Sequence, residues 1–451
     1  MLSSAFKSIR ARNGAAASAV STQVRTYAKK KSVETSTAFV EKYAHYQVPT
    51  YSRPNTVMER GEGSFLYDTD GKKYIDLTAG IAVNSLGHCP PLVTYTLMKQ
   101  ASTLVHSSNM YYNKTAPILS EKLVEATINS GGMKDATAVF LSNSGTESNE
   151  AALKFARKYG KIVGKGGENT KKTGLVSFKG AFHGRSFGAL SMTPNPKYQG
   201  PFAPLVPDVT YGDYNDIAGL ETLITENTAG VIVEPIQGEG GINVADHEFL
   251  IALRKRCDEV DAILIFDEIQ AGLSRTGKLW AHSHAGPEAH PDIITCAKAL
   301  GNGFPIGAVI VNSKVNDIIK VGDHGTTYGG NPLAAAVAIE VLKELTSKSL
   351  LDNVAVRART IEQKFDQIIE AYPNLATSRR GVGLMQGLQL TIDPSHVISK
   401  AHQKGLLLLS CGKNTIRLVP PLNIPHPTLV NGLSILKKIF KEIDNDINGK
   451  I

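Results

Sequence analysis

The stretch AILIFDEIQAGLSRTGK, residues 262–278, begins with an uninterrupted apolar run and continues into polar residues and glycines. A short apolar run of this kind is typical of a strand that is buried on both faces of a parallel sheet. Asp267 falls where this strand would end. In open parallel sheets, ligands bind beyond the carboxyl ends of the strands. The stretch therefore predicts both a fold class and a candidate site residue.

Similar apolar runs lie on both sides of this stretch and alternate with helical segments. The runs are AVFL (138–141), LVSF (175–178), GVIVEP (230–235), AILIFDE (262–268) and GAVIV (307–311). Alternation of strands and helices predicts an α/β fold with a mostly parallel sheet that helices cover on both faces. We expect this large domain to span residues 96–332.

The chain beyond residue 332 has a different pattern. Residues 334–345 and 356–372 are typical of helices, short strand-like runs follow within 384–420, and an amphipathic helix ends the chain. This predicts a smaller α+β domain over residues 333–451. Residues 28–95 would join it from the other end of the chain, with two short strands around the Asp70-Gly71 turn.

The net charge of the chain is +8, and basic residues concentrate at the N-terminus. Residues 1–33 contain seven lysines and arginines, and no acidic residue precedes Glu34. A segment that contains arginine, is rich in serine and lacks acids is typical of a mitochondrial transit peptide, although a disordered basic tail can have the same composition. We expect residues 1–27 to be a transit peptide and the mature chain to reside in the mitochondrial matrix.

Several other classes of protein are not supported. The charge outside the N-terminal segment is nearly balanced, so we expect no nucleic-acid partner. No apolar run reaches the roughly 20 residues of a membrane helix. The four cysteines have no CxxC spacing, and the histidines at 183, 282, 284 and 290 lack partners at ligand spacing, so we expect no metal.

The segment NSGTESNE, residues 143–150, follows a predicted strand and opens a helix. Ser144, Gly145 and Thr146 would therefore lie at a helix N-terminus. Free N–H groups and the helix dipole favour an anion there, typically a phosphate. Serine and threonine also cap helices without binding a ligand, so this segment alone leaves both interpretations open.

Two further residues extend the pattern. A carboxylate at Asp267 could keep a heterocyclic nitrogen protonated, or it could cap a helix. In TCAKALGNGFPIGA (295–308), Lys298 lies in a stretch short of charge, where desolvation lowers a lysine pKa and frees the amine as a nucleophile. A lone lysine can instead extend its ammonium to solvent. Gly301, Gly303 and Gly307 allow close backbone approach.

Together these features match the requirements of pyridoxal phosphate. The cofactor needs an anchor for its phosphate, an acid at its ring nitrogen and an amine for its aldehyde. A phosphate cradle, Asp267 and an amine 31 residues further on supply all of them. The combined pattern predicts a pyridoxal phosphate enzyme and disfavours a protein that has kept only the fold for binding.

The chain resembles the class III (ω-amino acid) aminotransferases, which have the aspartate-aminotransferase fold, fold type I of the pyridoxal phosphate enzymes. The resemblance begins at about residue 46 and extends to the C-terminus. The matching motifs are LTAGIAVNSLGH (77–88), HSSNMYY (106–112), NSGTESNE (143–150), FHGRSFGALSMT (182–193), EPIQGEGG (234–241), FDEIQAGLSRTGKLWA (266–281), AKALGNGFPIGA (297–308) and HGTTYGGNP (324–332). The resemblance implies a sheet of the seven-stranded type, a ping-pong transamination and a homodimer with active sites at the subunit interface.

The resemblance also implies how the cofactor is held. Lys298 would bind it covalently and then move a proton between cofactor and substrate carbons, and Asp267 would pair with the ring nitrogen. Phe182 would stack on the ring, and Gln270 would contact its 3-hydroxyl. The full implied cofactor-binding set is Ser144, Gly145, Thr146, Phe182, Asp267, Gln270, Lys298 and Thr327, with Thr327 reaching the phosphate from the neighbouring subunit.

Substrate carboxylates call for guanidinium groups, which can form two parallel hydrogen bonds. By resemblance, Arg185 would hold a carboxylate of the amino donor, and Arg417 would hold the α-carboxylate of the keto acid. Glu239 would neutralise Arg417 while an ω-amine reaches the cofactor, and Thr326 completes the expected substrate-binding set.

The amino donor is suggested by one small residue. Relatives that use free ornithine have a tyrosine just before the Ala-Val-Asn of their own corresponding motif, and by resemblance its position in this chain is Gly80, in AGIAVN (79–84). A small residue leaves room for an acylated α-amine. We therefore expect N2-acetyl-L-ornithine and 2-oxoglutarate as substrates, with free ornithine or another ω-amine, such as 4-aminobutyrate, as the alternative donor.

Overall fold

The computed structural model describes residues 34–167 and 170–449 of the 451-residue chain. The expected transit peptide, residues 1–27, lies outside the described residues. The described chain divides into two compact units. One contains the described residues up to Arg60 together with Leu66–Lys73, and the other contains Gly61–Phe65 and Tyr74 onward.

The first unit begins with helix α2 (Ser36–Tyr43) and the turn η1 (Ala44–Tyr46). Thr35 caps α2, because its side chain accepts a hydrogen bond from the Ala38 N–H. Within the same unit, the backbone N–H of Ser36 donates to Asp70 Oδ1 at 3.1 Å. Along the chain follow strands β1 (Met58–Glu62), β2 (Phe65–Asp68) and β3 (Lys73–Asp76), of which β3 belongs to the second unit from Tyr74 onward. Strands β2 and β3 flank the predicted Asp70-Gly71 turn.

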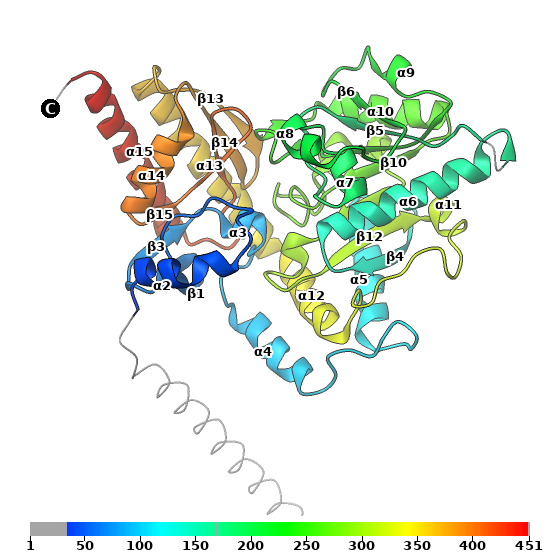
Figure 1. Ribbon diagram of the computed structural model, residues 1–451, viewed down its shortest axis with the longest axis horizontal. Helices are drawn as coiled ribbons and strands as arrows, with labels where there is room; N and C mark the ends of the chain where they lie inside the picture. Colours follow the sequence, from blue (N-terminus) through cyan, green and yellow to red (C-terminus); the bar gives the residue numbers. More distant parts are fainter. Residues whose placement is uncertain (1–33, 168–169, 450–451) are drawn as a thin grey trace, which may run out of the picture. The chain divides into compact units, whose positions relative to one another are not determined.

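The second unit contains a seven-stranded sheet in the order β4-β12-β11-β10-β7-β5-β6 (Figure 1). Its strands are β4 (Ala136–Ser142), β5 (Gly174–Phe178), β6 (Val209–Gly212), β7 (Thr228–Val233), β10 (Ile263–Asp267), β11 (Ile293–Cys296) and β12 (Gly307–Asn312). Strand β12 runs opposite to the other strands of this sheet. The prediction of a mostly parallel α/β sheet is confirmed.

Alternating side chains of the central strands bury opposite faces of this sheet. Ile263 and Ile265 belong to a core cluster with Phe155 of α6 (Gly145–Val163). Leu264 and Phe266 belong to another cluster, which includes Phe249 and Leu253 of α10 (His247–Glu259). Helices α5 (Thr115–Asn129) and α12 (Pro332–Leu345) pack on each other, and α5 packs on β4. Helices therefore cover both faces, as the apolar strand sequences require.

The C-terminal part forms a second, antiparallel sheet in the order β13-β14-β17-β16. Its elements are α13 (Lys348–Ala371), β13 (Ala376–Val382), β14 (Met385–Leu390), α14 (Pro394–Gln403), β15 (Leu406–Leu407), β16 (Leu409–Cys411), β17 (Thr415–Leu418) and α15 (His426–Ile447). Strand β15 pairs in parallel with β3, with Leu406 opposite Ile75. Distant parts of the sequence thus build the smaller α+β part, as predicted, whereas the boundaries at 27, 95 and 332 stay predictions.

The remaining elements are short connections around these two sheets, apart from α4. They are α3 (Ala79–Ala82), α4 (Pro91–Ala101), α7 (Phe187–Ser191), α8 (Pro196–Gln199), η3 (Gly200–Phe202), α9 (Leu220–Leu223), β8 (Ile236–Gln237), β9 (Asn243–Val244), η4 (Ala281–Ala285), η5 (Pro287–Ala289), η6 (Lys298–Leu300) and α11 (Ser313–Asn316). None of the described helices has both the length and the apolar character needed to cross a bilayer.

Candidate active site

The turn between β4 and α6 leads into the N-terminus of a 19-residue helix. Ser144 is the N-cap of α6, and its side chain accepts a hydrogen bond from the Glu147 N–H at 3.3 Å. Glu147 in turn accepts from the Asn143 N–H at 2.7 Å, which fixes the turn from both sides. Gly145 and Thr146 are the first residues of the helix, where N–H groups have no intrahelical acceptor. This geometry suits a phosphate.

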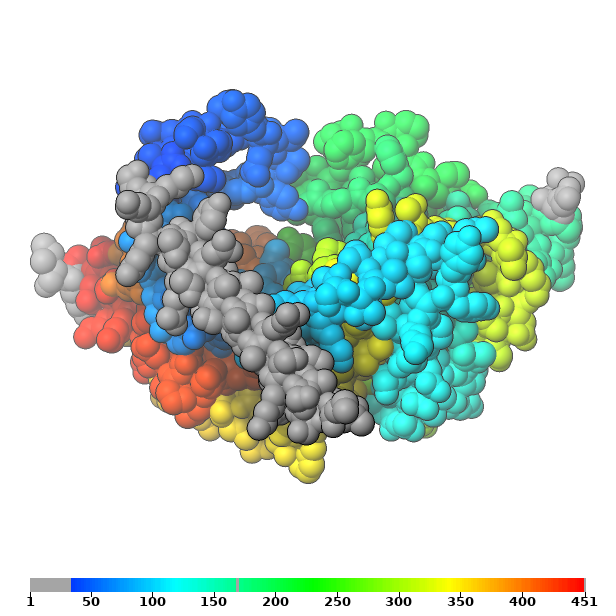
Figure 2. Space-filling view, turned by 90° about the horizontal axis from the view of Figure 1, so that it is seen from below, coloured from blue at the N-terminus to red at the C-terminus, as the bar shows by residue number. Residues whose placement is uncertain are grey.

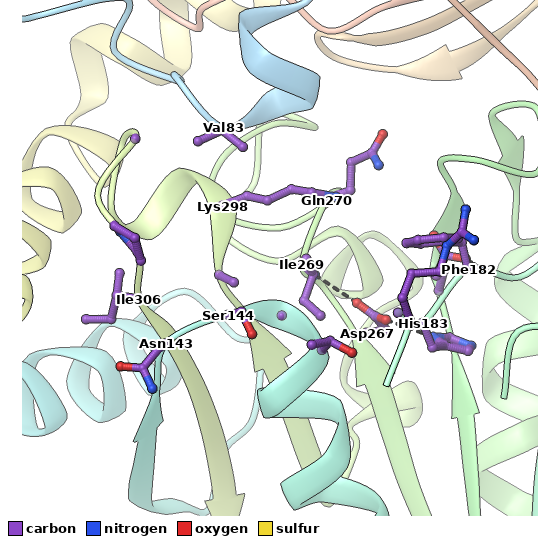
Figure 3. A pocket seen from close by; sticks show the side chains of 18 of the residues that line it. Val83, Asn143, Ser144, Phe182, His183, Asp267, Ile269, Gln270, Lys298 and Ile306 are labelled. Carbon is purple, nitrogen blue, oxygen red and sulfur yellow. Dashed lines mark hydrogen bonds and ion pairs between the residues drawn. The ribbon is translucent and has the colours of Figure 1, made fainter. Parts of the chain in front are cut away.

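Asp267 lies at the end of β10 with its carboxylate buried. Its Oδ2 accepts from Asn149 Nδ2 at 2.8 Å and lies 2.7 Å from His183 Nδ1. Its Oδ1 accepts from the Ile269 N–H at 3.1 Å (Figure 3). Three partners from different segments therefore fix the orientation of this carboxylate before any ligand binds.

Lys298 follows β11 and begins the short turn η6 with a backbone φ of 37°. Burial lowers the pKa of its amine to about 8, and the nearby Asp267 charge opposes this effect only in part. No hydrogen bond to the amine is found among the described residues. Figure 3 shows its extended side chain in the cavity that Gln270 and Asp267 also line. An amine with a pKa near neutrality can act as a nucleophile and as a proton carrier.

One cavity of about 400 Å³ brings most of the predicted residues together. Those that line it are Ser144, Gly145, Thr146, Phe182, Arg185, Asp267, Gln270 and Lys298. Close backbone approach shapes the phosphate end, since a Cβ on Gly145 would lie 2.8 Å from the Ile269 side chain. The structure thus gathers these side chains in one place, and their individual roles stay predictions.

Arg417 and Glu239 lie beside this cavity and contact it through Gln270. Arg417 on β17 is 2% exposed, and its Nη2 lies 3.2 Å from Glu239 Oε2. Its Nη1 donates to Gly238 O at 3.1 Å and to Gln270 Oε1 at 3.3 Å. Its buried Nε has no acceptor among the described residues. The guanidinium therefore keeps an unused donor for a further oxygen ligand.

Arg185 also lines the cavity, but it is exposed to solvent. Its guanidinium stacks at 3.6 Å on the Tyr198 ring and lies 5.6 Å from the Phe182 ring centroid. In the described part of the chain no carboxylate pairs with it. Stacking orients the planar group and leaves its N–H edges available for an incoming carboxylate.

Thr326 and Thr327 occupy different positions. Thr326 Oγ1 accepts from Asn143 Nδ2 at 3.2 Å, at the edge of the cavity. Thr327 is exposed and does not line the cavity of its own chain. The surrounding loop is fixed by Asn109, which donates to Thr326 O and Gly329 O at 2.9 and 3.0 Å. The structure therefore separates Thr327 from the other predicted residues.

Sequence reasoning missed three residues of the site. Glu234 lines the cavity directly after β7, and its carboxylate accepts from the N–H groups of Phe182 and Gly238. It obeys the same rule that identified Asp267, because it follows the carboxyl end of a parallel strand. His183 and Asn149 lie within the quoted motifs FHGRSFGALSMT and NSGTESNE, but nothing local in the sequence indicated that they contact Asp267, since their position behind the carboxylate depends on the tertiary fold.

The residues present fit pyridoxal phosphate. Free N–H groups at the start of α6 suit its phosphate, and the fixed Asp267 carboxylate suits its ring nitrogen. The Lys298 amine, with a pKa of about 8, suits its aldehyde.

The family model for aminotransferase class-III matches residues 46–440, and the chain therefore belongs to this family. The solved ornithine aminotransferase of Toxoplasma gondii ME49 matches with a TM-score of 0.84 at 31% identity, covering 94% of this chain and 98% of that one. The fold is thus fold type I of the pyridoxal phosphate enzymes, and one Toxoplasma gondii structure reveals partial occupancy of PLP at its active site.

Particular relatives within the family are more similar in sequence. The mitochondrial acetylornithine aminotransferase of Yarrowia lipolytica is 55% identical over 89% of this chain and 95% of that protein. The N-acetylornithine aminotransferase of Stenotrophomonas maltophilia K279a, a solved structure, is 37% identical with a TM-score of 0.75 and covers 89% of this chain and 99% of that one.

Proposed function

We propose that this aminotransferase transfers the δ-amino group of N2-acetyl-L-ornithine to 2-oxoglutarate, giving N-acetyl-L-glutamate 5-semialdehyde and L-glutamate, a step of arginine biosynthesis. The observation that carries the proposal is the cavity in which the start of α6, Asp267 and Lys298 converge. Identity of 55% to a relative named acetylornithine aminotransferase supports the choice of substrate.

When bound, pyridoxal phosphate supplies an electron sink that stabilises negative charge on the substrate carbon. Gly145 and Thr146 would bind its phosphate, and Phe182 would cover its ring. Asp267 would keep the ring nitrogen protonated. Lys298 would hold the cofactor covalently and, once released by the substrate, would take a proton from one carbon and return it to another.

Two arginines explain how one site can accept two unlike substrates. Arg185 would hold a carboxylate that both substrates have. In the structure Glu239 pairs with Arg417, which leaves no net charge where the uncharged part of an ω-amine donor must pass. A dicarboxylate such as 2-oxoglutarate would displace Glu239 and engage Arg417, whose unused Nε offers a further hydrogen bond.

The acetylated donor is supported by the turn that holds Gly80. Residues 79–82 all have positive φ, with 64° at Gly80, and the turn leads into Val83 at the cavity wall. Gly80 itself is exposed and does not line the cavity. We propose that the acyl group of the donor lies over this turn, where Gly80 contributes no side chain. Ornithine aminotransferases have the same fold, so fold alone does not distinguish the donors, and the choice rests on Gly80 and on the named relatives.

We also infer that the protein acts as a homodimer in the mitochondrial matrix. Large apolar side chains are exposed on α4 and on residues 104–112, where Tyr111 and Tyr112 are 74% and 99% exposed. Figure 2 shows this segment, in cyan, at the surface. A second copy that covers this patch could bring the Thr327 of the partner subunit to the phosphate. Relatives named as mitochondrial enzymes support the location, as does the composition of residues 1–27.

The decisive experiment mixes the purified holoenzyme with N2-acetyl-L-ornithine, ornithine or 4-aminobutyrate without an acceptor and follows the absorbance of the cofactor. We expect the fastest spectral change with N2-acetyl-L-ornithine. In Gly80→Tyr, the ratio of the rate constant with N2-acetyl-L-ornithine to that with ornithine should fall by about tenfold or more, because the ring would occupy the position proposed for the acyl group. Gly80→Ala carries the same backbone strain without the ring and serves as the matched control. A faster change with ornithine in the wild type would overturn the proposed donor.

A further inference from the structure

The loop that carries Glu239 is held by donors from the C-terminal sheet. Arg417 Nη1 donates to Gly238 O at 3.1 Å, and the Gly412 N–H donates to Glu239 O at 2.7 Å. Arg380 Nε donates to Gly241 O at 2.6 Å. The contact is close, since a Cβ on Gly412 would lie 2.4 Å from Gly240 O. Residues 238–241, here called the glutamate loop, are thus held by β13, β17 and the turn between β16 and β17. Within the large domain, Glu234 accepts from the Gly238 N–H at 3.1 Å, and Asn243 Nδ2 donates to Gly240 O at 3.3 Å.

Arg380 is itself fixed in place. Its Nη2 donates to Gln389 Oε1 at 3.0 Å and to Thr415 Oγ1 at 2.9 Å, on the neighbouring strands β14 and β17. The Gln389 amide donates to Lys413 O at 2.9 Å, which fixes the oxygen that it presents to Arg380. No carboxylate pairs with Arg380 in the described residues. This half-buried guanidinium therefore donates to two side chains that fix its orientation and to one carbonyl of the glutamate loop.

Of the groups that hold the glutamate loop, Arg417 would also bind the dicarboxylate, whereas Arg380 and Gly412 would not. In the proposed function, a dicarboxylate that binds Arg417 would open its ion pair with Glu239, and Arg417 would turn to the ligand. Arg380 and Gly412 do not contact Glu239 through its carboxylate, so they can hold the loop in both states. They therefore determine how well Glu239 is placed to compete for Arg417.

We propose that Arg380 is a positioning residue that holds the glutamate loop so that Glu239 competes with dicarboxylates for Arg417. The inference rests on the proposed function, because it assumes that Arg417 receives the acceptor. Without Arg380 the loop gains freedom, and the pair between Glu239 and Arg417 loses the advantage of being preorganised. A dicarboxylate should then bind more tightly, whereas general damage to the site would weaken its binding.

The test measures binding of glutarate, an unreactive dicarboxylate, to the holoenzyme by titration calorimetry. We expect Arg380→Gln to lower the Kd about three- to tenfold, since the competing closed state loses stability. Arg380→Lys keeps the charge but replaces the two separate donor nitrogens that reach Gly241 O and Gln389 Oε1 by a single one, so it should also tighten binding. Glu239→Gln should tighten binding by itself, and adding Arg380→Gln to it should give no further change.

Arg379→Gln is the matched control. Arg379 is adjacent on β13, but it pairs with the exposed Asp366 and has no contact with the glutamate loop, so this variant should bind glutarate like the wild type. Weaker glutarate binding in Arg380→Gln would overturn the role of Arg380. The role would also be overturned if Arg380→Gln changed the Kd equally in the wild-type and in the Glu239→Gln background. Unchanged binding in Glu239→Gln itself would instead overturn the proposed acceptor site and the inference with it.

Discussion

At the scale of the residue, the lysine that the sequence singled out has the environment its proposed chemistry needs. The pKa of Lys298 falls from 10.5 to about 8 because burial penalises the ammonium. A free amine attacks the cofactor aldehyde, so covalent incorporation into the apoenzyme should speed up about tenfold per pH unit up to about pH 8 and then level off. Stopped-flow absorbance between pH 6 and 10 checks this. A rate that levels off only above pH 10 would contradict it, and Lys298→Ala should show no covalent product.

Glu234 gives a second titration in the same cavity. Burial raises the pKa of this carboxyl to about 7, with the charge of Asp267 adding to the effect and that of His183 opposing it. Between the unfolded pKa of about 4.5 and the folded value, the folded state binds the extra proton, so wild-type stability should fall as pH rises from 5 to 7. Glu234→Gln keeps the shape without titrating. The variant should therefore become more stable relative to wild type by up to about 1.4 kcal/mol per pH unit over this window.

Denaturant unfolding of the apoenzyme at pH 5, 6 and 7 measures that difference. Glu248→Gln, at an exposed glutamate in the first turn of α10, is the control and should show no such trend. A constant difference between Glu234→Gln and wild type over the window would show that Glu234 is already ionised at pH 5.

At the scale of the element, close packing of β12 against the start of α6 builds the phosphate end. A Cβ on Gly307 would lie 2.5 Å from Ser142 Oγ and 2.6 Å from Ser144 O. Gly307→Ala should therefore destabilise the protein by about 2 kcal/mol or more and weaken cofactor binding, because β12 or the N-cap must move. Thermal unfolding and cofactor titration measure both effects. Gly200→Ala, where a Cβ meets nothing within 4 Å, is the control, and equal behaviour of the two variants would contradict the packing argument.

Prediction from sequence succeeded for elements with a strong local pattern and failed for those without one. The five apolar runs are strands of the large sheet, and the glycines after Lys298 do allow close approach. Strands β6, β11 and β13 were not predicted. Strand β6 carries the half-exposed Tyr211, and β13 contains two arginines and a glycine, whereas β11 is buried and as short as the AVFL and LVSF runs that were recognised. These segments are strands because they pair with neighbouring strands, and a local sequence pattern does not show this pairing.

The same division holds for the site. Residues that a local sequence pattern identifies, such as Ser144 at the start of a helix and Asp267 at the end of a strand, could be predicted. The network behind Asp267 could not, because Asn149 comes from α6 and His183 from a loop that only the fold brings near. Arg185, Glu239 and Arg417 were reached only through the resemblance, since a single arginine has no local signature of carboxylate binding.

At the scale of the whole molecule, the exposed position of Thr327 and the apolar patch around Tyr112 have one explanation in common. A second copy over this patch would bury the aromatic side chains and complete the phosphate site. Tyr112→Asp combined with Met110→Asp places charges in the patch, so it should convert the dimer to monomer and weaken cofactor binding at least tenfold. Analytical ultracentrifugation and cofactor titration report the two effects. Ile162→Asp, at a side chain 55% exposed on α6 and away from the patch, should change neither. The double variant could become monomeric and still bind the cofactor as tightly as the wild type. That result would support the proposed dimer interface, but it would exclude a contribution of Thr327 of the partner subunit to cofactor binding.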